Sequence, residues 1–187
     1  MPIDQIDKEI LNSLNLDGRM SLMQISEQLQ ESINVSMSHT GIRKRINKLK
    51  DEGILKIQGN LNIKALDFKA AFILMEMSNF NEVKKIIECY SDCPRVFLLA
   101  QITGQYNLIV GFVGRDMESL HRYLNQCGPT NKGGILHSAV IFVSNIENPD
   151  FLPLSMFKRQ SGEQKCGNVC NDCSAFMDGK CPGCGLF

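Results

Sequence analysis

In the first sixty residues, hydrophobic positions recur every three or four residues in three successive segments, which predicts three amphipathic helices. The first covers residues 4–14, with Ile6, Ile10, Leu11 and Leu14 on one face. The second follows Ser21, a favourable N-cap, and runs to about residue 29. The third lies within residues 36–53 and buries a stripe formed by Ile42, Ile46 and Leu49. Three such helices form a small domain with one shared core.

The third predicted helix is strongly basic. Ser38 is a good N-cap for it and Gly53 a plausible C-terminal stop. Five bases and no acid lie in one short window: Arg43, Lys44, Arg45, Lys48 and Lys50. Most of them project away from the apolar stripe, so the helix can bury one side and offer the other to phosphates. An isolated basic helix is more often a solvated face, but two preceding helices complete the order of a helix-turn-helix.

Residues of the basic helix that lie off the apolar stripe are the candidates for DNA contact. They are Ser38, His39, Thr40, Arg43, Lys44, Asn47 and Lys48. Arg43 can pair with guanine and Asn47 with adenine in the bidentate manner that specifies a base. Arg45 lies at the edge of the stripe, and we expect it to pack its stem and pair with an acid. Short apolar segments at 54–57 and 61–63 predict a hairpin, and hence a winged helix-turn-helix over residues 1–60.

Hydrophobic segments between residues 61 and 150 predict a second domain in the order strand, helix, strand, strand, helix, strand. The strands are expected at 68–77, 96–102, 107–113 and 135–143, and the helices at 80–90 and from Asp116 to about Gly128. This is the ferredoxin-like order, an antiparallel sheet with both helices on one face, so the fold class is α+β. The other face needs cover, and a second copy of it would give a symmetric homodimer.

Two sets of residues resemble the Lrp/AsnC (feast/famine) family of transcriptional regulators, over residues 3–150. The first set is Ile6-Asp7-Lys8-Glu9-Ile10-Leu11, Asp17-Gly18-Arg19, and Ile42, Arg45, Ile46, Leu49, Gly53 and Ile54 at their spacing. The second is the turn Thr103-Gly104-Gln105-Tyr106-Asn107, which is similar to the family's Thr-Gly-x-Tyr-Asp turn. The connector at 30–35 is several residues longer than is usual in the family.

The resemblance implies a regulator that binds double-stranded DNA as a dimer or larger oligomer. It also implies a small-molecule effector near the turn, at Thr103, Gly104, Tyr106 and Asn107. Asn107 stands where the family has Asp, which removes a charge that would face an amino group. In the alternative interpretation, Gly104 permits the turn, Tyr106 packs, and no effector binds.

An enzyme is the alternative function, because sirohaem decarboxylases resemble the same two-domain architecture. Such an enzyme should offer polar catalytic groups, histidines above all, in the second domain. That domain contains only His121 and His137. A lone histidine is more often a surface or core residue than a catalytic one. Together with the intact basic helix, this favours a regulator.

Composition and charge agree with a packed DNA-binding protein whose basic surface is local. The 187 residues are 43% hydrophobic with a net charge of zero, and residues 1–60 hold eight acids and eight bases. A neutral monomer with one basic helix would bind DNA weakly, whereas a dimer doubles the phosphates that it neutralises. No hydrophobic run is long enough to span a bilayer and no signal peptide is evident, so we expect a cytoplasmic protein.

Five of the eight cysteines lie in a tail at 165–187, after a linker expected at 151–164: Cys166, Cys170, Cys173, Cys181 and Cys184. Two pairs spaced by two residues can each close a turn around one ion, and four thiolates satisfy tetrahedral zinc. Cys170, Cys173, Cys181 and Cys184 therefore predict a zinc site, with Cys166 as a fifth candidate. An iron–sulfur cluster and a metal-free redox switch remain alternatives. The earlier Cys89, Cys93 and Cys127 are expected to be buried thiols.

Overall fold

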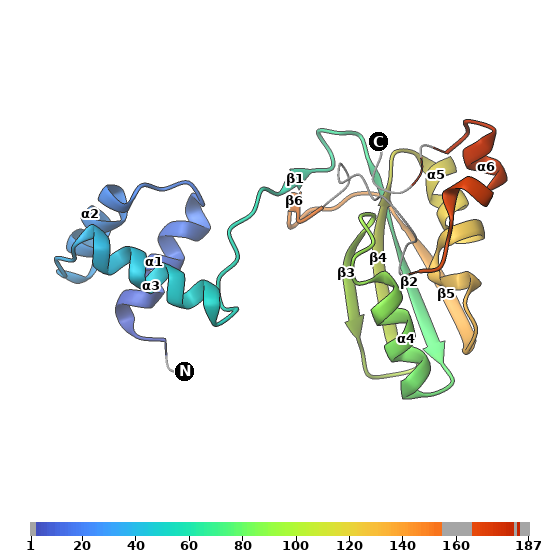
Figure 1. Ribbon diagram of the computed structural model, residues 1–187, viewed down its shortest axis with the longest axis horizontal. Helices are drawn as coiled ribbons and strands as arrows, with labels where there is room; N and C mark the ends of the chain where they lie inside the picture. The colour runs from blue at the N-terminus through green and yellow to red at the C-terminus, as the bar shows by residue number, and fades with distance from the viewer. Residues whose placement is uncertain (1–2, 155–165, 182, 184–187) are drawn as a thin grey trace. The chain divides into compact units, whose positions relative to one another are not determined.

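The chain divides into two compact units, residues 1–59 and residues 60–187. A computed structural model describes residues 3–154, 166–181 and 183 (Figure 1). The first unit is helical and the second combines helices with a sheet, which confirms the predicted mixed α+β class. None of the helices in the described parts of the chain is long and apolar enough to cross a membrane.

The helices of the N-terminal unit are α1 (Gln5–Leu16), α2 (Leu22–Ile33) and α3 (His39–Asp51). Asp4, Ser21 and Ser38 cap their starts, and the first two of these form reciprocal capping boxes. The apolar stripes meet in one core of buried residues, Ile10, Leu14, Ile25, Leu29, Ile42 and Leu49. The three predicted helices and their inward faces are confirmed.

The connector before α3 is shorter than the sequence predicts, because α2 continues through residues 30–33. Asn34 ends α2 in the left-handed conformation (φ 53°), which asparagine tolerates better than most residues, and its N–H donates to the carbonyls of α2's last turn. Ser26 Oγ donates to the Met37 carbonyl at 3.0 Å and so fixes the connector against α2. The sequence did not predict this last turn, because its residues are mostly polar and do not continue the apolar stripe of α2.

The hairpin wing predicted after α3 is absent from residues 54–63. The chain turns at Gly53 (φ 70°), and the next two backbone N–H groups donate to the carbonyl of Leu49 in α3. The later segment forms β1 (Leu61–Asn62), which pairs antiparallel with β6 (Phe151–Leu152). The prediction of a wing was therefore wrong, because a strand from far along the chain takes the place of the expected hairpin partner.

The second unit is built on an antiparallel sheet in the order β3-β4-β2-β5. Its strands are β2 (Lys69–Met77), β3 (Val96–Gln101), β4 (Leu108–Gly114) and β5 (Ile135–Val143). The connecting helices are α4 (Phe80–Tyr90) and α5 (Met117–Arg122), followed by a π-helical turn η1 (Tyr123–Cys127) and a 3-10 turn η2 (Pro129–Asn131). The succession β2-α4-β3-β4-α5-β5 is the ferredoxin-like order.

Both helices cover the same face of the sheet. Alternate residues of β2, from Ala71 to Met77, are buried there with Ile86 of α4 and Leu120 of α5. The opposite face, called here the open face, is formed by Phe72, Leu74, Phe97, Leu98, Ile109 and Ile141. Two of these, Leu98 and Ile141, are 38% and 50% exposed. In a single copy of the chain, nothing among the described residues covers this face fully.

Gly111 shapes the open face. A Cβ at this position would lie 2.7 Å from the Phe97 ring and 2.9 Å from the Phe72 ring, closer than real contacts allow. The two rings pack edge to face over the glycine, with centroids 5.6 Å apart. The glycine therefore leaves room for two large aromatic side chains to pack against each other and over the strand.

The described part of the cysteine-rich tail packs against the second unit. It contains a 3-10 turn, η3 (Cys170–Asp172), and a short helix, α6 (Ser174–Met177), which lies beside α5 (Figure 1). Hydrogen bonds between the tail and the domain include those from Lys132 Nζ to the Cys166 carbonyl (2.6 Å), from Asn168 Nδ2 to the Cys127 carbonyl (3.1 Å), and from Arg95 Nη2 to the Gly183 carbonyl (3.3 Å). Most of the predicted linker, 155–164, lies outside the described residues.

Candidate nucleic-acid interface

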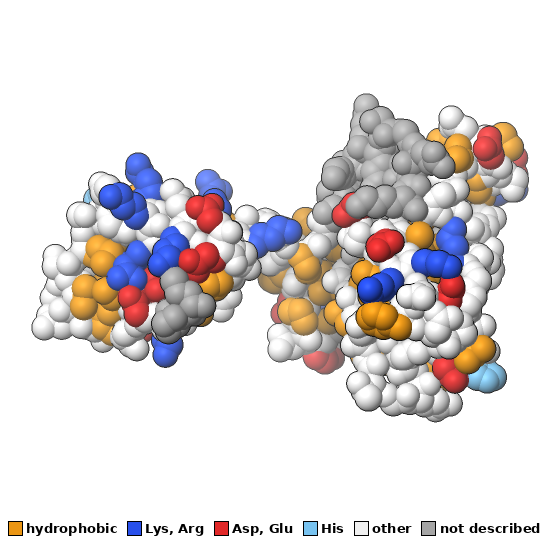
Figure 2. All heavy atoms as spheres, turned by 60° about the horizontal axis from the view of Figure 1, so that its bottom comes forward, with side chains coloured by type: hydrophobic (Ala, Val, Ile, Leu, Met, Phe, Trp, Pro, Cys, Tyr) orange, Lys and Arg blue, Asp and Glu red, His pale blue; other side chains and the backbone are white. Residues whose placement is uncertain are grey.

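The polar side of α3 is exposed within the N-terminal unit. All of the predicted DNA contacts are exposed: Ser38, His39, Thr40, Arg43, Lys44, Asn47 and Lys48. On the opposite side Ile42 and Leu49 are buried, and Ile46 is half-buried. Figure 2 shows Lys and Arg side chains standing on the surface of this unit beside acidic and apolar ones. The helix therefore offers one continuous strip of donors and charges to a partner.

Arg45 lies at the border of that strip and does a different job. Its Nη1 donates to Asp4 Oδ2 and to Asp7 Oδ1, both at 2.7 Å, which ties α3 to the start of α1. The Asp7 side chain is only 7% exposed. The Asp7 backbone N–H and the Arg45 guanidinium hold the pKa of Asp4 below its usual value, and the two carboxylates raise the pKa of Arg45. The prediction that Arg45 pairs with an acid is confirmed.

The start of α3 is held by its own cap. Ser38 Oγ accepts a hydrogen bond from the Gly41 N–H at 3.2 Å, while the serine itself stays exposed. The first N–H groups of a helix point outward along its axis and favour an anion such as a phosphate. Because α3 carries no acid in its first turn, this end of the helix is open to one.

Comparison with known proteins places the chain in a family. No family model matches it. The uncharacterized HTH-type transcriptional regulator PH0140 of Pyrococcus horikoshii is 30% identical over 128 residues, which are 65% of this chain and 74% of that protein. The HTH-type transcriptional regulator FL11 of the same organism is 26% identical over 158 residues, 82% of this chain and 98% of the relative. The chain belongs to this family of HTH-type transcriptional regulators.

Solved structures show that the regulator has the Lrp/AsnC fold. E. coli AsnC has a TM-score of 0.64 at 19% identity, with 79% of this chain and 95% of that chain covered. B. subtilis LrpC has a TM-score of 0.60 at 18% identity, with 79% and 99% covered. These relatives and neighbours are transcriptional regulators and not enzymes, which confirms that prediction. His121, the first enzyme candidate, is exposed and stacks on Phe142 with ring centroids 5.1 Å apart.

The turn that the regulator was predicted to use for an effector joins β3 to β4. Thr103 and Gly104 are exposed, and Tyr106 is half-buried. Asn107 Oδ1 accepts from the Met77 N–H at 2.8 Å, and its Nδ2 donates to the Met77 carbonyl at 2.9 Å. A carboxylate cannot make the second bond, so Asn107 fits a role in holding β4 to the end of β2. Effector binding at these four residues stays a prediction.

The predicted metal ligands of the regulator fall into two groups. Cys170, Cys173 and Cys181 line one cavity of 370 Å³, while Cys184 lies outside the described residues. Cys166 instead packs against the sheet's core, and its sulfur accepts from Asn168 Nδ2 at 3.3 Å. Within residues 3–154, 166–181 and 183, no three His, Cys, Asp or Glu side chains are placed to hold a metal ion. A zinc site stays a prediction that needs Cys184.

The three cysteines of the sheet domain, Cys89, Cys93 and Cys127, are half-buried and pack against its core. Burial raises the pKa of Cys127 to about 12, and it raises the pKa of Cys93 as well. Cys93 Sγ lies 3.7 Å from the hydroxyl of Tyr123. Thiols held protonated in this way are poor nucleophiles and poor metal ligands.

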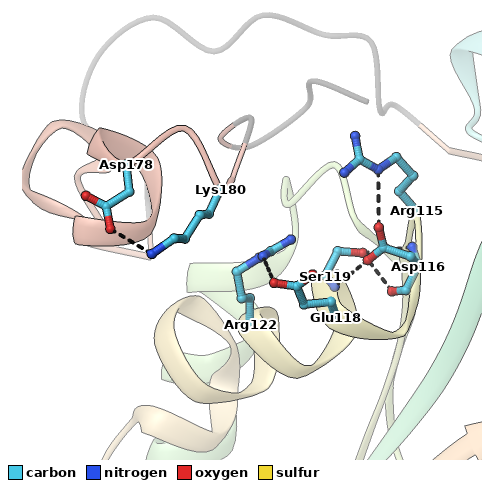
Figure 3. A network of polar contacts seen from close by, with 7 residues as sticks. All are labelled: Arg115, Asp116, Glu118, Ser119, Arg122, Asp178 and Lys180. Atoms are coloured by element: carbon cyan, nitrogen blue, oxygen red, sulfur yellow. Dashed lines mark hydrogen bonds and ion pairs between the residues drawn. The ribbon is translucent and has the colours of Figure 1, made fainter.

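Sequence reasoning missed the residues that hold the tail against the domain, above all Arg95, Lys132 and Asn168. Arg95 is 3% exposed, and Arg122 lies on α5 where it faces the tail cavity (Figure 3). Arg95 directly precedes the apolar strand β3, and this is one weak signal, since an arginine is almost never buried without partners. The partners themselves come from distant segments, which no local pattern reveals.

Proposed function

We propose that this regulator binds double-stranded DNA sequence-specifically through α3 and that it acts as a homodimer. The observation that carries the proposal is the division of α3 into a buried apolar side and an exposed side with all seven candidate residues. A helix of this kind, braced by the helix before it, enters the major groove in helix-turn-helix proteins. The names of the relatives, HTH-type transcriptional regulators, agree with it.

The roles within the interface follow from side-chain chemistry. Arg43 reads guanine and Asn47 reads adenine, because their donors and acceptors match those base edges in pairs. Lys44 and Lys48 neutralise phosphates, which supplies affinity but no sequence information. Ser38, His39 and Thr40 lie at the exposed start of α3, where backbone N–H groups and short polar side chains suit a phosphate.

The open face of the sheet supports the homodimer. It presents aromatic and branched apolar residues that include Leu98, 38% exposed, and Ile141, 50% exposed. A second copy of the same face is self-complementary in composition and would remove these groups from water through an isologous contact. A dimer also carries two copies of α3, which doubles the number of phosphates that one complex neutralises.

We propose zinc for the tail, held by Cys170, Cys173, Cys181 and Cys184. Spacing supports this set, because each pair can close a turn around one ion, and Gly183 (φ 85°) has the left-handed backbone that such a turn uses. Cys166 is left out, since its carbonyl and its sulfur are both engaged with the domain. The metal would fold a segment too small for a core of its own.

One selection experiment tests the function. Purified full-length protein is mixed with random duplex DNA at stated salt, bound duplexes are sequenced, and the selection is repeated with EDTA. A recovered two-fold symmetric motif supports sequence-specific binding by a dimer. Weak binding with no enriched motif contradicts it.

The EDTA arm addresses the tail. Loss of zinc with unchanged DNA selection would make the metal a structural element only, whereas loss of the motif would link the tail to DNA binding. A visible absorption spectrum of protein purified without oxygen separates the two metals, because a zinc–thiolate site is colourless and an iron–sulfur cluster is brown.

A further inference from the structure

We infer that the connector between α2 and α3, residues 34–38, sets the position of α3 and so decides which bases this helix reads. This role rests on the proposed DNA-binding function, and it adds the residues that control specificity. The connector is extended and its side chains alternate: Val35 and Met37 are half-buried, whereas Asn34, Ser36 and Ser38 are exposed. One side of the connector therefore packs against the helices.

The start of the connector is fixed to the last turn of α2. The Asn34 N–H donates to the Gln30 carbonyl at 3.1 Å. The Val35 N–H donates to the Leu29 carbonyl at 3.2 Å. The Asn34 side chain adds another bond, in which its Oδ1 accepts from Gln30 Nε2 at 2.7 Å. These bonds define the direction in which the chain leaves α2.

The end of the connector is fixed by Met37 in two ways. Its carbonyl accepts a hydrogen bond from Ser26 Oγ at 3.0 Å, which ties the residue before the cap of α3 to the middle of α2. Its side chain packs against the core of the three helices and lies over Gly41 in the first turn of α3. Met37 therefore contacts α2 through its backbone and α3 through its side chain.

Gly41 makes the contact between Met37 and α3 close. A Cβ at Gly41 would lie 3.1 Å from Met37 Cγ and 3.4 Å from its Sδ, so a methyl group there requires the methionine or the helix to move. Glycine weakens a helix, because it loses more backbone freedom on folding than other residues do. A glycine inside a helix therefore needs a packing reason, and the approach of Met37 supplies one.

The connector is not the only attachment of α3. Arg45 ties the helix to Asp4 and Asp7 of α1. On the apolar side, Ile42 and Leu49 are buried in the shared core. Loss of the contacts made by the connector therefore leaves α3 folded and attached, but it frees the first turn to shift.

A small shift of this turn changes base reading more than it changes affinity. Arg43 and Asn47, the two proposed base readers, follow Gly41 closely in α3 and move with it. A bidentate pair with a base edge needs two aligned hydrogen bonds, and such contacts tolerate displacements of only about 0.5 Å. The contacts of Lys44 and Lys48 with phosphates depend mainly on charge and tolerate more. The connector is thus a positioning element for specificity.

Binding of the full-length protein to two duplexes tests this role. One is the selected duplex, and the other has a single base pair of the motif replaced. The ratio of their dissociation constants measures discrimination, and the salt slope measures phosphate contacts. Ser26→Ala removes the donor to Met37, so discrimination should fall at least about fivefold with an unchanged salt slope. Ser26→Thr keeps the hydroxyl and should restore discrimination. Ser32→Ala, at an exposed serine of the same helix, is the matched control and should behave as wild type.

A second set of variants tests the contact with Gly41. Gly41→Ala places a methyl group against Met37 and should lower discrimination in the same way. Combination with Met37→Ala removes the side chain that the methyl group meets, so the double variant should discriminate better than Gly41→Ala alone. Gly59→Ala is the control, because a Cβ there meets nothing within 4 Å. Equal weakening on both duplexes, with no relief in the double variant, would mean that the methyl group meets DNA and would overturn the inference.

Hydrogen exchange of the free protein, followed by mass spectrometry, separates the positioning role from the proposed function. In Ser26→Ala, amide exchange in residues 34–42 should rise at least about tenfold, while exchange in α1 stays unchanged. Such a rise without a recovered DNA motif would keep the positioning role and remove only the proposed function. Unchanged exchange in residues 34–42 would overturn the inference, and so would unchanged discrimination in Ser26→Ala.

Discussion

At the scale of single residues, Arg43 and Arg45 have different roles because they lie on different sides of α3. Arg43 is exposed on the polar face, where it is free to meet a base edge. Arg45 is turned toward α1, and its side chain is 29% exposed because two carboxylates hold it. The number of basic residues in α3 is therefore larger than the number of basic side chains that are free to contact DNA.

Replacement of Arg45 by alanine should destabilise the N-terminal unit by about 1–3 kcal/mol, because it leaves the nearly buried Asp7 carboxylate without its charged donor. Urea unfolding followed by circular dichroism measures the change. The pKa of Asp4 is lowered in the folded state, so its share of the stability is present above pH about 3.8 and is lost as pH falls through the folded pKa. The difference between wild type and variant should therefore shrink in acid. Arg43→Ala is the control, with unchanged stability and weaker DNA binding.

Replacement of Asn107 by aspartate should cost about 1–3 kcal/mol of stability, because the carboxylate cannot donate to the Met77 carbonyl and would face it as a second acceptor. Thermal unfolding of the full-length protein measures the cost. Asn107→Asp restores the residue usual in the family at this turn. Unchanged stability, combined with newly gained binding of an amino acid, would show that this side chain faces a ligand and not β2.

The thiol of Cys127 should react slowly with iodoacetamide in the native protein. Burial raises its pKa from an ordinary 9.0 to about 12, so the thiolate that reacts is scarce at neutral pH. A pH series analysed by mass spectrometry should give a midpoint about three units higher in native than in urea-unfolded protein. A folded pKa above the unfolded one favours the fold below pH about 9, and this contribution is lost as pH rises toward 12. Equal midpoints in the two states would rule out this burial.

At the scale of elements, the features that local sequence encodes were predictable, and those that need distant partners were not. Ser38 and Gly53 mark the ends of α3 by their own backbone chemistry, and the inward stripe follows from spacing alone. The prediction of a wing failed because β1 pairs with β6, a strand about 90 residues further along the chain. Rules for hairpins consider only strands that are close in sequence, so they cannot predict this pair. Likewise, Arg95 and Arg122 are far along the chain from the tail residues with which they line a cavity, so no local pattern shows that they meet. The exposed strip of α3 was predictable because helical periodicity decides it.

The exposed lysines of α3 should contribute to affinity without reading sequence. Lys44→Gln or Lys48→Gln should weaken binding to the selected duplex and to a scrambled duplex by the same factor, and should lower the salt slope of log K by about one. Fluorescence anisotropy at several salt concentrations measures both quantities. Lys56→Gln, which follows the turn after α3, serves as the matched charge control. A lysine variant that weakens only the selected duplex would place that lysine on a base edge.

At the scale of the whole molecule, charge and burial lead to the same requirement for a second copy. The chain has no net charge, and its basic surface in the first unit is concentrated on one helix, so a single copy neutralises few phosphates. The open face meanwhile leaves Leu98 and Ile141 partly in water. Pairing of two open faces would bury the exposed apolar groups. It would also bring a second α3 into the same particle, which increases the number of phosphates that one complex neutralises.

A charge on the open face should therefore separate the copies and weaken DNA binding from a distance. Ile141→Lys places an ammonium opposite Phe72 on this face, and in a symmetric dimer the change counts twice, so the dimer dissociation constant should rise at least about 100-fold. Sedimentation velocity across protein concentration measures it. Ser138→Lys is the matched control, since Ser138 is exposed on the same strand but pairs with Met75 on the helix-covered side. The Ile141→Lys monomer should bind the selected duplex with about half the wild-type salt slope, because it brings one α3 instead of two.

An unchanged dimer dissociation constant in Ile141→Lys would mean that the two copies meet through another surface. The open face would then need another partner.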